Sequence, residues 1–158
     1  MRKSGGLSSS PKSLSKSAPS VENKLDRVFS TYRRLLFADK NETGRCVTCG
    51  ATMHWKYLQL GHYIGRGAEA VRWEENNGWP QCSVCNCNTI NPGEPEKYAA
   101  FLDRQIGVEQ REQIENYRTN FNIPTPHQKD QLLLSLKRKL RILRKERKSP
   151  DYVPPTLL

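Results

Sequence analysis

The first strong periodic pattern lies between Glu22 and Ala38, where apolar residues recur at steps of three and four. These residues are Leu25, Val28, Phe29, Tyr32, Leu35 and Leu36. This spacing predicts an amphipathic helix. Arg27 and Arg34 fall on the opposite face, with Lys24 and Arg33 on its flanks. We therefore expect the helix to pack on a core and to offer its basic side to a phosphate backbone.

Two further regions carry weaker patterns. The stretch from Trp55 to Leu60 partly alternates between apolar and polar residues, which predicts a strand that leads into His62, in a simple hairpin. After Pro95, helical periodicity returns with Tyr98, Phe101, Leu102 and Ile106. Gly107 is a typical helix stop, and a second helix is expected from Val108 to about Tyr117.

The last periodic segment follows a Pro124-Thr125-Pro126 break. Its apolar positions are Leu133, Leu136, Leu140 and Leu143. Their alternating steps of three and four form a short coiled-coil seam of two heptads. The seam could cover the core of its own chain or pair with a second copy as a homodimer, and packing within the chain is the default expectation.

Composition divides the 158-residue chain into three parts. Residues 1–21 are rich in serine and lysine and are expected to form a disordered basic tail. Residues 22–118 should hold one small α+β domain, and residues 127–150 a basic amphipathic helix. No apolar run is long enough to cross a membrane. With no signal peptide either, we expect a protein of the cytoplasm.

The formal net charge of +10 is concentrated in the two ends of the chain. The last helix alone contains nine basic residues against two acidic ones, and its cations include Lys137, Arg138, Arg141 and Arg144. Clustered cations gain affinity for nucleic acid by releasing counterions from phosphates, so we expect these four residues to contact DNA. A solvated helix that aids solubility is the plainer alternative. An anionic membrane surface is less favoured, because the helix lacks Trp and Phe anchors.

Candidate chemistry begins with two Cys-x-x-Cys pairs, Cys46/Cys49 and Cys82/Cys85. Two such pairs complete the tetrahedral site that structural Zn²⁺ prefers. Two disulfides are the alternative, but the absence of a signal peptide and the odd cysteine count argue against it. The fifth cysteine, Cys87, is either a bystander, which we favour, or an alternative ligand.

Three polar residues between and after these pairs are candidates for catalysis. Phosphodiester hydrolysis needs a base and a cation, and a neutral His62 could take the proton from water. Asn77 could orient the ring through its side-chain carbonyl, and Asn86 could offer its carbonyl oxygen to a hard cation. The plainer alternatives are a packed or zinc-binding histidine, a turn at Asn77 and a helix cap at Asn86.

The ordered set of motifs resembles a known family. The motifs are Cys-x-x-Cys, Gly-His-Tyr, Arg-x-x-x-x-x-Arg-Trp, Glu-Asn-Asn and Pro-Gln-Cys-x-x-Cys-Asn. Together they are similar to the phage recombination protein family NinG, also called Rap, over residues 22–118. That family is placed among the HNH, or His-Me finger, nucleases and is associated with cutting branched DNA. The resemblance implies a zinc-stabilised ββα core with flanking helices, acting in the cytoplasm of a bacterial host cell.

Carried over by position, the resemblance makes His62 the general base, Asn77 the central asparagine, and Asn86 a ligand of the catalytic Mg²⁺ or Mn²⁺. Many HNH nucleases have an Asp or His ligand immediately before the base, and this chain has Gly61 there. Glu74, Glu75 or a substrate phosphate oxygen is expected to replace the missing ligand.

Arg66 and Arg72 are candidate phosphate contacts, since guanidinium groups bind phosphate in a bidentate manner. The sequence therefore predicts a metal-dependent endonuclease for branched DNA. A non-catalytic zinc module that binds nucleic acid or a recombination partner is the alternative, and Gly61 favours it.

Overall fold

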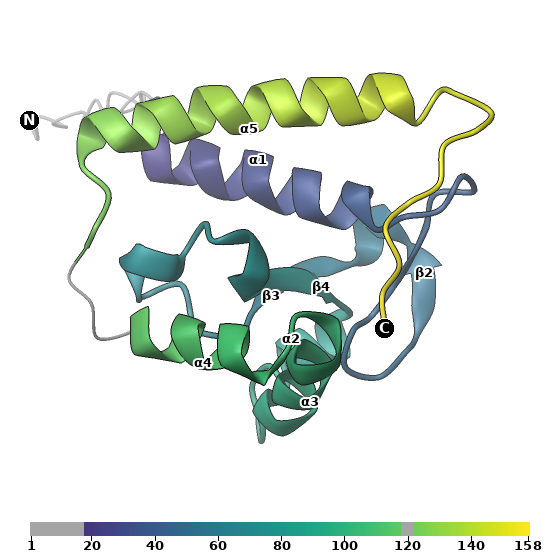
Figure 1. Ribbon diagram of the computed structural model, residues 1–158, viewed down its shortest axis with the longest axis horizontal. Coiled ribbons are helices and arrows are strands. Elements are labelled where there is room, and N and C mark those ends of the chain that lie inside the picture. Colours follow the sequence, from purple (N-terminus) through teal and green to yellow (C-terminus); the bar gives the residue numbers. More distant parts are fainter. Residues whose placement is uncertain (1–17, 118–121) are drawn as a thin grey trace, which may run out of the picture.

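The computed structural model describes residues 18–117 and 122–158 and shows a mixed α+β fold (Figure 1). Five α-helices, three short 3-10 turns and two two-stranded antiparallel sheets make up the described part of the chain. The α+β class is thus confirmed. The predicted disordered tail falls almost wholly on residues 1–17, which lie outside the described residues.

Helix α1 (Val21–Leu36) matches the first predicted helix closely. The Ser20 side chain caps it by accepting a hydrogen bond from the Asn23 N–H at 3.3 Å. Such caps satisfy one of the free N–H groups of a first turn. Leu25 and Phe29 are fully buried on its inner face. The predicted amphipathic helix is therefore confirmed.

Two arginines on α1 differ from the prediction of a solvated basic side. Arg33 is only 3% exposed, and its Nε donates to the Gly78 carbonyl at 2.9 Å. Arg34 donates from Nη1 to the Leu58 carbonyl at 2.7 Å. Both guanidinium groups satisfy backbone carbonyls of the neighbouring sheet region, which is why they turn inwards. They fasten α1 to the domain instead of facing a phosphate backbone.

The two sheets do not follow the predicted single hairpin. Strands β1 (Thr43–Arg45) and β2 (Thr52–His54) pair with each other around the first cysteine pair. The chain then makes the 3-10 turn η1 (Trp55–Tyr57) where a strand was expected. The cause is local, because the His54 Nδ1 accepts the Lys56 N–H at 3.2 Å and turns the chain.

The strand that carries the histidine, β3 (Gln59–His62), pairs with the distant β4 (Gly78–Gln81). The connection between them contains the 3-10 turns η2 (Glu69–Val71) and η3 (Glu75–Asn77). Helix α2 (Ser83–Asn86) follows β4 directly. The order β3–β4–α2 therefore forms a small ββα unit that positions the candidate site.

Helices α3 (Pro95–Gln105) and α4 (Val108–Tyr117) confirm the next two predicted helices. Gly107 separates them with φ +89°, a conformation that residues with a side chain rarely adopt. The buried Tyr98 of α3 donates its hydroxyl to the Gly61 carbonyl at 3.0 Å. This hydrogen bond therefore ties helix α3 to strand β3, next to His62.

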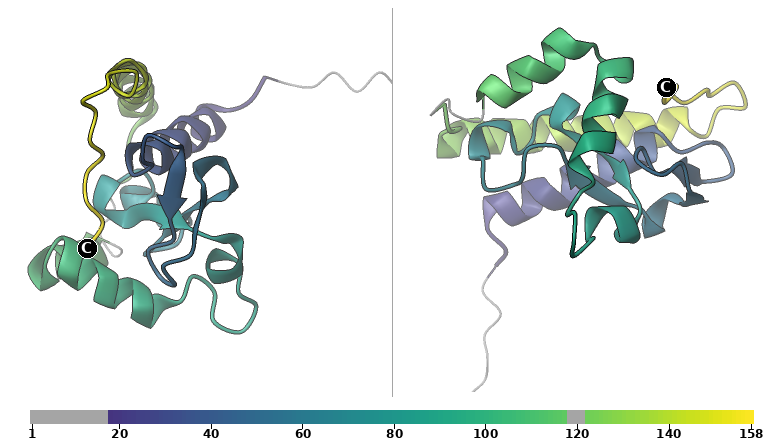
Figure 2. Two further views of the ribbon diagram at one scale, coloured as in Figure 1. Left: turned by 90° about the vertical axis from the view of Figure 1, so that its right-hand side faces the viewer. Right: turned by 90° about the horizontal axis from the view of Figure 1, so that it is seen from below.

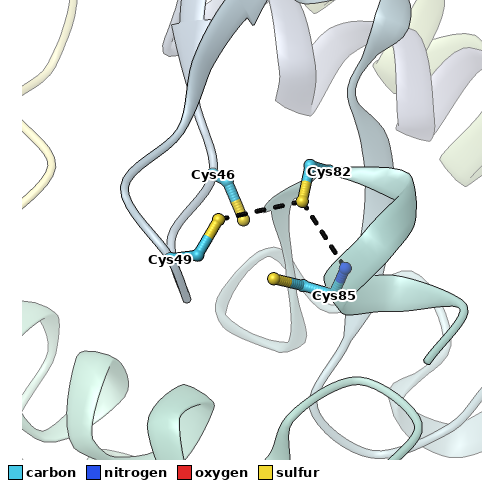
Figure 3. A group of neighbouring side chains, drawn as sticks. All are labelled: Cys46, Cys49, Cys82 and Cys85. Carbon is cyan, nitrogen blue, oxygen red and sulfur yellow. Dashed lines mark hydrogen bonds between the residues drawn. The ribbon is translucent and has the colours of Figure 1, made fainter.

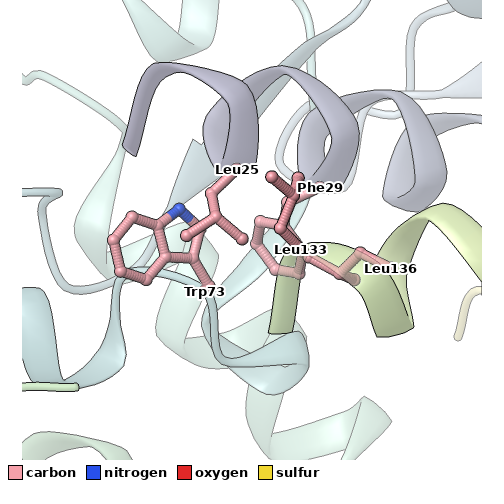
Figure 4. Close-up of a cluster of buried hydrophobic side chains, with 5 residues drawn as sticks. All are labelled: Leu25, Phe29, Trp73, Leu133 and Leu136. Atoms are coloured by element: carbon pink, nitrogen blue, oxygen red, sulfur yellow. The ribbon is translucent and has the colours of Figure 1, made fainter. Parts of the chain in front are cut away.

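Helix α5 (Pro126–Glu146) lies along α1, as Figures 1 and 2 show. All four seam leucines are buried, and Leu133 and Leu136 contact Leu25, Phe29 and Trp73 (Figure 4). Packing within the chain is thus confirmed, and the seam is not available to a second copy. A homodimer through another surface stays a prediction. Among the described helices, none is long and apolar enough to cross a membrane.

Candidate metal centre and nucleic-acid cleft

Four cysteine side chains converge between the β1–β2 hairpin and the start of α2 (Figure 3). The sulfur atoms of Cys46, Cys49, Cys82 and Cys85 all lie within 4.8 Å of one another, and the Cys49 and Cys82 Sγ atoms are 3.8 Å apart. Tetrahedral Zn²⁺ with Zn–S bonds of about 2.3 Å places its sulfurs about 3.8 Å apart. The cluster is thus consistent with a structural Zn²⁺ site.

The local backbone explains why the sulfurs meet. Gly50 adopts φ +76° and its N–H donates to the Cys46 carbonyl at 2.9 Å, which closes the first knuckle. The Asn86 N–H donates to the Cys82 carbonyl at 3.0 Å and closes the second. All five cysteines are free thiols, so the disulfide alternative is not what the structure shows. Cys87 lies outside the cluster, as the bystander interpretation predicts.

His62 ends β3 with its ring held from one side. Its Nε2 lies 3.0 Å from the Arg72 backbone carbonyl. Since a carbonyl can only accept, Nε2 carries the proton and Nδ1 keeps its lone pair. Burial lowers the pKa of His62 below its usual value, and the hydrogen bond to the carbonyl opposes that shift. The neutral ring is therefore the form expected near pH 7.

The described hydrogen bonds of the Asn77 side chain do not involve the His62 ring. Asn77 is fully buried, its Oδ1 accepts the Ile64 N–H at 2.7 Å, and its Nδ2 donates to the Ile64 and Val71 carbonyls at 3.0 and 2.9 Å. These three bonds close the loop between β3 and η2. The hydrogen bond to the ring comes instead from the Arg72 carbonyl.

The two candidate phosphate-binding arginines have different surroundings. The Arg66 side chain is 65% exposed and its Nη1 lies 3.8 Å from Asp26 Oδ2. Arg72 is mostly covered and donates from Nε and Nη2 to the two Asp26 oxygens at 3.0 and 2.6 Å. Arg72 thus forms a bidentate ion pair, which does not favour its predicted role as a phosphate contact. Arg66 remains free to reach a ligand.

Asp26 is a residue of the site that the sequence did not reveal. It lies on α1, and the Trp73 Nε1 also donates to it, at 2.8 Å. Burial acts to raise the pKa of Asp26, but the hydrogen bonds from Arg72 and Trp73 outweigh burial and hold the pKa below its usual value. Helical spacing places Asp26 beside the apolar face, yet nothing in the spacing indicates its distant partners.

Asn86 lies at the end of α2 and faces the same space as His62. Its Nδ2 donates to Gln59 Oε1 at 2.6 Å, which leaves its own Oδ1 directed elsewhere. The Cys87 thiol donates to the same Gln59 oxygen at 3.2 Å. Gln59 therefore orients the end of α2, a role that its position in the sequence did not suggest.

These residues line one open cleft of about 550 Å³. It brings together His62, Arg66 and Asn86, with Gln59, Tyr63 and Cys87 among the other lining residues. Among the residues that line it, none is a carboxylate. Asp26 lines a smaller adjoining pocket of about 70 Å³ that also reaches His62 and Arg66.

The missing metal ligand at position 61 has a steric cause. A Cβ at Gly61 would lie 1.8 Å from Gln81 Oε1, so no side chain fits there without displacing Gln81. Glu75, one of the predicted replacements, is instead paired with Arg33 at 3.5 Å and Lys139 at 2.6 Å. Neither Glu74 nor Glu75 lines the cleft. The geometry therefore supports neither Glu74 nor Glu75 as the replacement ligand.

The four predicted DNA contacts on α5 lie away from the cleft. Lys137, Arg138, Arg141 and Arg144 are all exposed. None of them forms an ion pair within the described part of the chain. They are therefore accessible, but they form a surface separate from His62.

Fold and site together define a small α+β protein with a four-cysteine, zinc-type centre beside a cleft that contains His62, Arg66 and Asn86. The family model of the bacteriophage lambda NinG protein matches residues 9–146, and the chain belongs to this family. No curated protein and no solved structure matches the chain. The resemblance noted in the sequence is thus confirmed at the level of the family.

Proposed function

We propose that this protein is a metal-dependent DNA endonuclease that acts on branched recombination intermediates. The observation that supports it most is the state of His62: the ring is held by the Arg72 carbonyl through Nε2, and its Nδ1 is left with a lone pair in a cleft that also contains Arg66 and Asn86. The β3–β4–α2 unit has the strand, strand and helix order of a His-Me finger, which supports the same proposal.

The chain's own residues would divide the work as follows. His62 Nδ1 takes a proton from the attacking water. The Arg72 carbonyl holds the resulting imidazolium in place by accepting the hydrogen bond from its Nε2–H. Arg66 pairs with the phosphate, since its guanidinium is exposed and forms only a long contact to Asp26. Asn77 acts indirectly, because it closes the loop that carries Arg66.

The donor set for a catalytic cation is sparse but suited to a hard ion. Asn86 Oδ1 is the amide oxygen available in the cleft, and Mg²⁺ usually keeps several waters and takes further ligands from substrate phosphates. Asn86 would therefore hold Mg²⁺ or Mn²⁺ together with a phosphate oxygen of the substrate. The ion would neutralise charge that develops on the scissile phosphate.

A second candidate function is a non-catalytic zinc module that binds nucleic acid or a recombination partner. The observation that favours it is the absence of a carboxylate among the residues that line the main cleft. A cation held by one amide oxygen of the protein takes its other ligands from water and from the substrate. The two functions predict the same DNA binding and differ only in turnover.

A cleavage assay on the wild type and on His62→Ala distinguishes the two functions. We expect the wild type to cut at least one member of a panel of linear, flap and four-way DNA substrates with Mg²⁺ or Mn²⁺. His62→Ala should bind the same DNA and retain zinc but lose cleavage by about 100-fold or more, as expected when a general base is removed. His127→Ala is the matched control, since this exposed histidine lies at the start of α5.

Wild-type cleavage should also rise with pH and level off, because the base works in its neutral form and burial lowers the pKa of His62. Cleavage by His62→Ala at the wild-type rate would rule out this residue as the base. A wild type that binds every substrate and cuts none would favour the non-catalytic module.

A further inference from the structure

Apart from Lys145, the cations of α5 and the adjoining Arg147 fall into two groups with different contacts. Lys129 donates to Glu22 at 2.9 Å and to Glu69 at 3.3 Å, Lys139 pairs with Glu75 at 2.6 Å, and Arg147, just beyond the helix, donates to backbone carbonyls at the end of α1. These three fasten α5 to the domain. Lys137, Arg138, Arg141 and Arg144 have no acidic partner within the described residues, so a structural role does not account for them.

Helix geometry places most of the second group on one flank. At about 100° per residue, Lys137 and Arg141 each lie about 160° around the axis from Lys139, and Arg144 about 140°. Lys139 lies on the flank of α5 that faces η3, since its Nζ reaches Glu75 and lies 5.9 Å from the Tyr32 ring centre. The other three therefore occupy the opposite, outward flank, which faces away from η3. Arg138 points away from the buried seam.

Helix α1 extends this positive surface. Lys24 and Arg27 are exposed and have no ion pair in the part of the chain that the structure describes. Val28 packs in the cluster with Leu140 and Leu143, and Lys24 lies only about 40° around the helix from it. Lys24 thus lies beside the side of α1 that faces α5. Arg27 lies about 100° from both Val28 and Asp26, on the exposed side of α1 between them.

The small pocket that adjoins the cleft lies on the other side of the same helix. Asp26 and Ser30 of α1 line this pocket together with His62 and Arg66, which also line the cleft. Each of the two α1 residues lies about 160° around the helix axis from Val28, which faces α5. Helix α1 therefore has the pocket adjoining the cleft on one side and α5 on the other.

We propose that the outer faces of α1 and α5 form a second DNA-binding surface, the α1–α5 basic face, which binds the phosphate backbone of a separate duplex segment while the cleft holds the first. The face consists of Lys24, Arg27, Lys137, Arg138, Arg141 and Arg144. This proposal rests on the proposed function, which gives the cleft its role in holding DNA. The substrate would then be a DNA with two duplex arms, both bound by the protein at the same time.

The dimensions and chemistry of the face suit a phosphate backbone. Lys137 and Arg144 are seven residues apart, or about 10 Å along the helix, which matches about three phosphates of one strand at 3.4 Å of axial rise each. No cavity is needed, because phosphate contacts are made at the surface of the duplex. The exposed Leu134 and Ile142 are eight residues apart, too sparse for an apolar protein interface.

The test is a bridging assay in buffer without Mg²⁺ or Mn²⁺. One duplex is immobilised, and a second, labelled duplex is added together with the full-length protein. Bridging is measured as the amount of labelled duplex retained. We expect Arg141→Gln/Arg144→Gln to reduce bridging by about tenfold or more and to flatten the log-affinity versus log-salt slope by about 1.8, or 0.9 for each lost contact. The exposed pair Arg45→Gln/Arg104→Gln removes equal charge elsewhere and should leave bridging unchanged.

Native mass spectrometry counts the copies involved. A complex of one protein with two duplexes is expected for the wild type, and one duplex for Arg141→Gln/Arg144→Gln. Unchanged bridging and slope in that variant, an equal loss in the control pair, or bridging that requires two protein copies would each overturn the proposal. Loss of cleavage in His62→Ala with bridging intact would support the proposed function separately. A wild type that bridges two duplexes but cuts none would contradict the proposed function and still support the α1–α5 basic face.

Discussion

The zinc-type centre and the α1–α5 helix pair are stabilised by different means. Around the cysteines the buried cluster is small, with Cys46, Cys82 and Cys85 packed on Leu58. The helix pair instead buries two larger apolar clusters along the seam and adds ion pairs at Lys129 and Lys139. We therefore expect the stability of one half to depend on metal ligation and that of the other on packing. The small pocket that adjoins the candidate cleft lies where they meet, since it is lined by His62 of β3 and Asp26 of α1.

The largest expected effect comes from removing a cysteine ligand. Structural zinc contributes about 10 kcal/mol or more to small metal domains, so Cys82→Ser should unfold the β1–β2 and ββα units. We expect loss of bound zinc, loss of the cooperative melt and a reduced circular dichroism signal. Cys87→Ser is the matched control and should retain zinc, because its thiol lies outside the cluster.

A chelator should reproduce the Cys82→Ser result in the wild type. A metal-free Cys82→Ser protein that keeps full helicity and a cooperative melt would contradict the idea that metal ligation stabilises this half.

The next effect tests the packed half. Leu136 is 2% exposed and Leu134 of the same helix is 67% exposed. Leu136→Ala should lower the free energy of unfolding by about 2–5 kcal/mol because it leaves a cavity beside Phe29, whereas Leu134→Ala should change it by less than about 0.5 kcal/mol. Urea melts measure both, and zinc content should stay constant. Equal effects of the two substitutions would show that α5 does not depend on its seam.

The smallest effect tests the junction between the two halves. Asp26→Asn should weaken the bidentate contact to Arg72 and lower the free energy of unfolding by about 1.5–3 kcal/mol, the usual range for hydrogen bonds to charged groups. The Arg72 carbonyl would then hold His62 less firmly. Nitrogen NMR of the imidazole should show a mixture of the two neutral tautomers, where the wild type shows the Nε2-protonated form.

Asp103→Asn is the control for this junction, since Asp103 pairs with Arg111 at 2.5 Å between α3 and α4 and has no described ion pair or hydrogen bond to Arg72 or His62. An unchanged tautomer in Asp26→Asn would mean that Asp26 does not position His62. Cleavage assays on both variants then show whether the tautomer matters for turnover.

Several elements could be predicted because their signals are local. Apolar spacing located α1, α3 and α5, and Gly107 marked the boundary after which α4 begins. The Cys-x-x-Cys spacing predicted the cluster of four cysteines, since each pair is closed by a short turn. The strand prediction failed at Trp55–Tyr57, because the His54 side chain turns the chain there.

Other roles depend on partners far away in the chain. Arg33 and Arg34 resemble surface cations by spacing, yet carbonyls 45 and 24 residues away bind them. The Asn77 side chain bonds Ile64 and Val71 and closes a loop, and none of these hydrogen bonds reaches the ring that it was expected to orient. In each case the hydrogen-bond partner, and hence the role, follows from how the chain folds back on itself.

The sequence by itself determined the helices, the cysteine knuckles, the family and the concentration of positive charge on the last helix. These follow from repeats of three and four residues, short turns and composition, all of which act over a few residues. Only the tertiary structure decided that Asp26 binds Arg72, that the Arg72 carbonyl holds His62, and that Arg66 and Arg72 differ in exposure. The reason is that a buried charge or polar group takes whichever partner the packing of distant segments brings within reach.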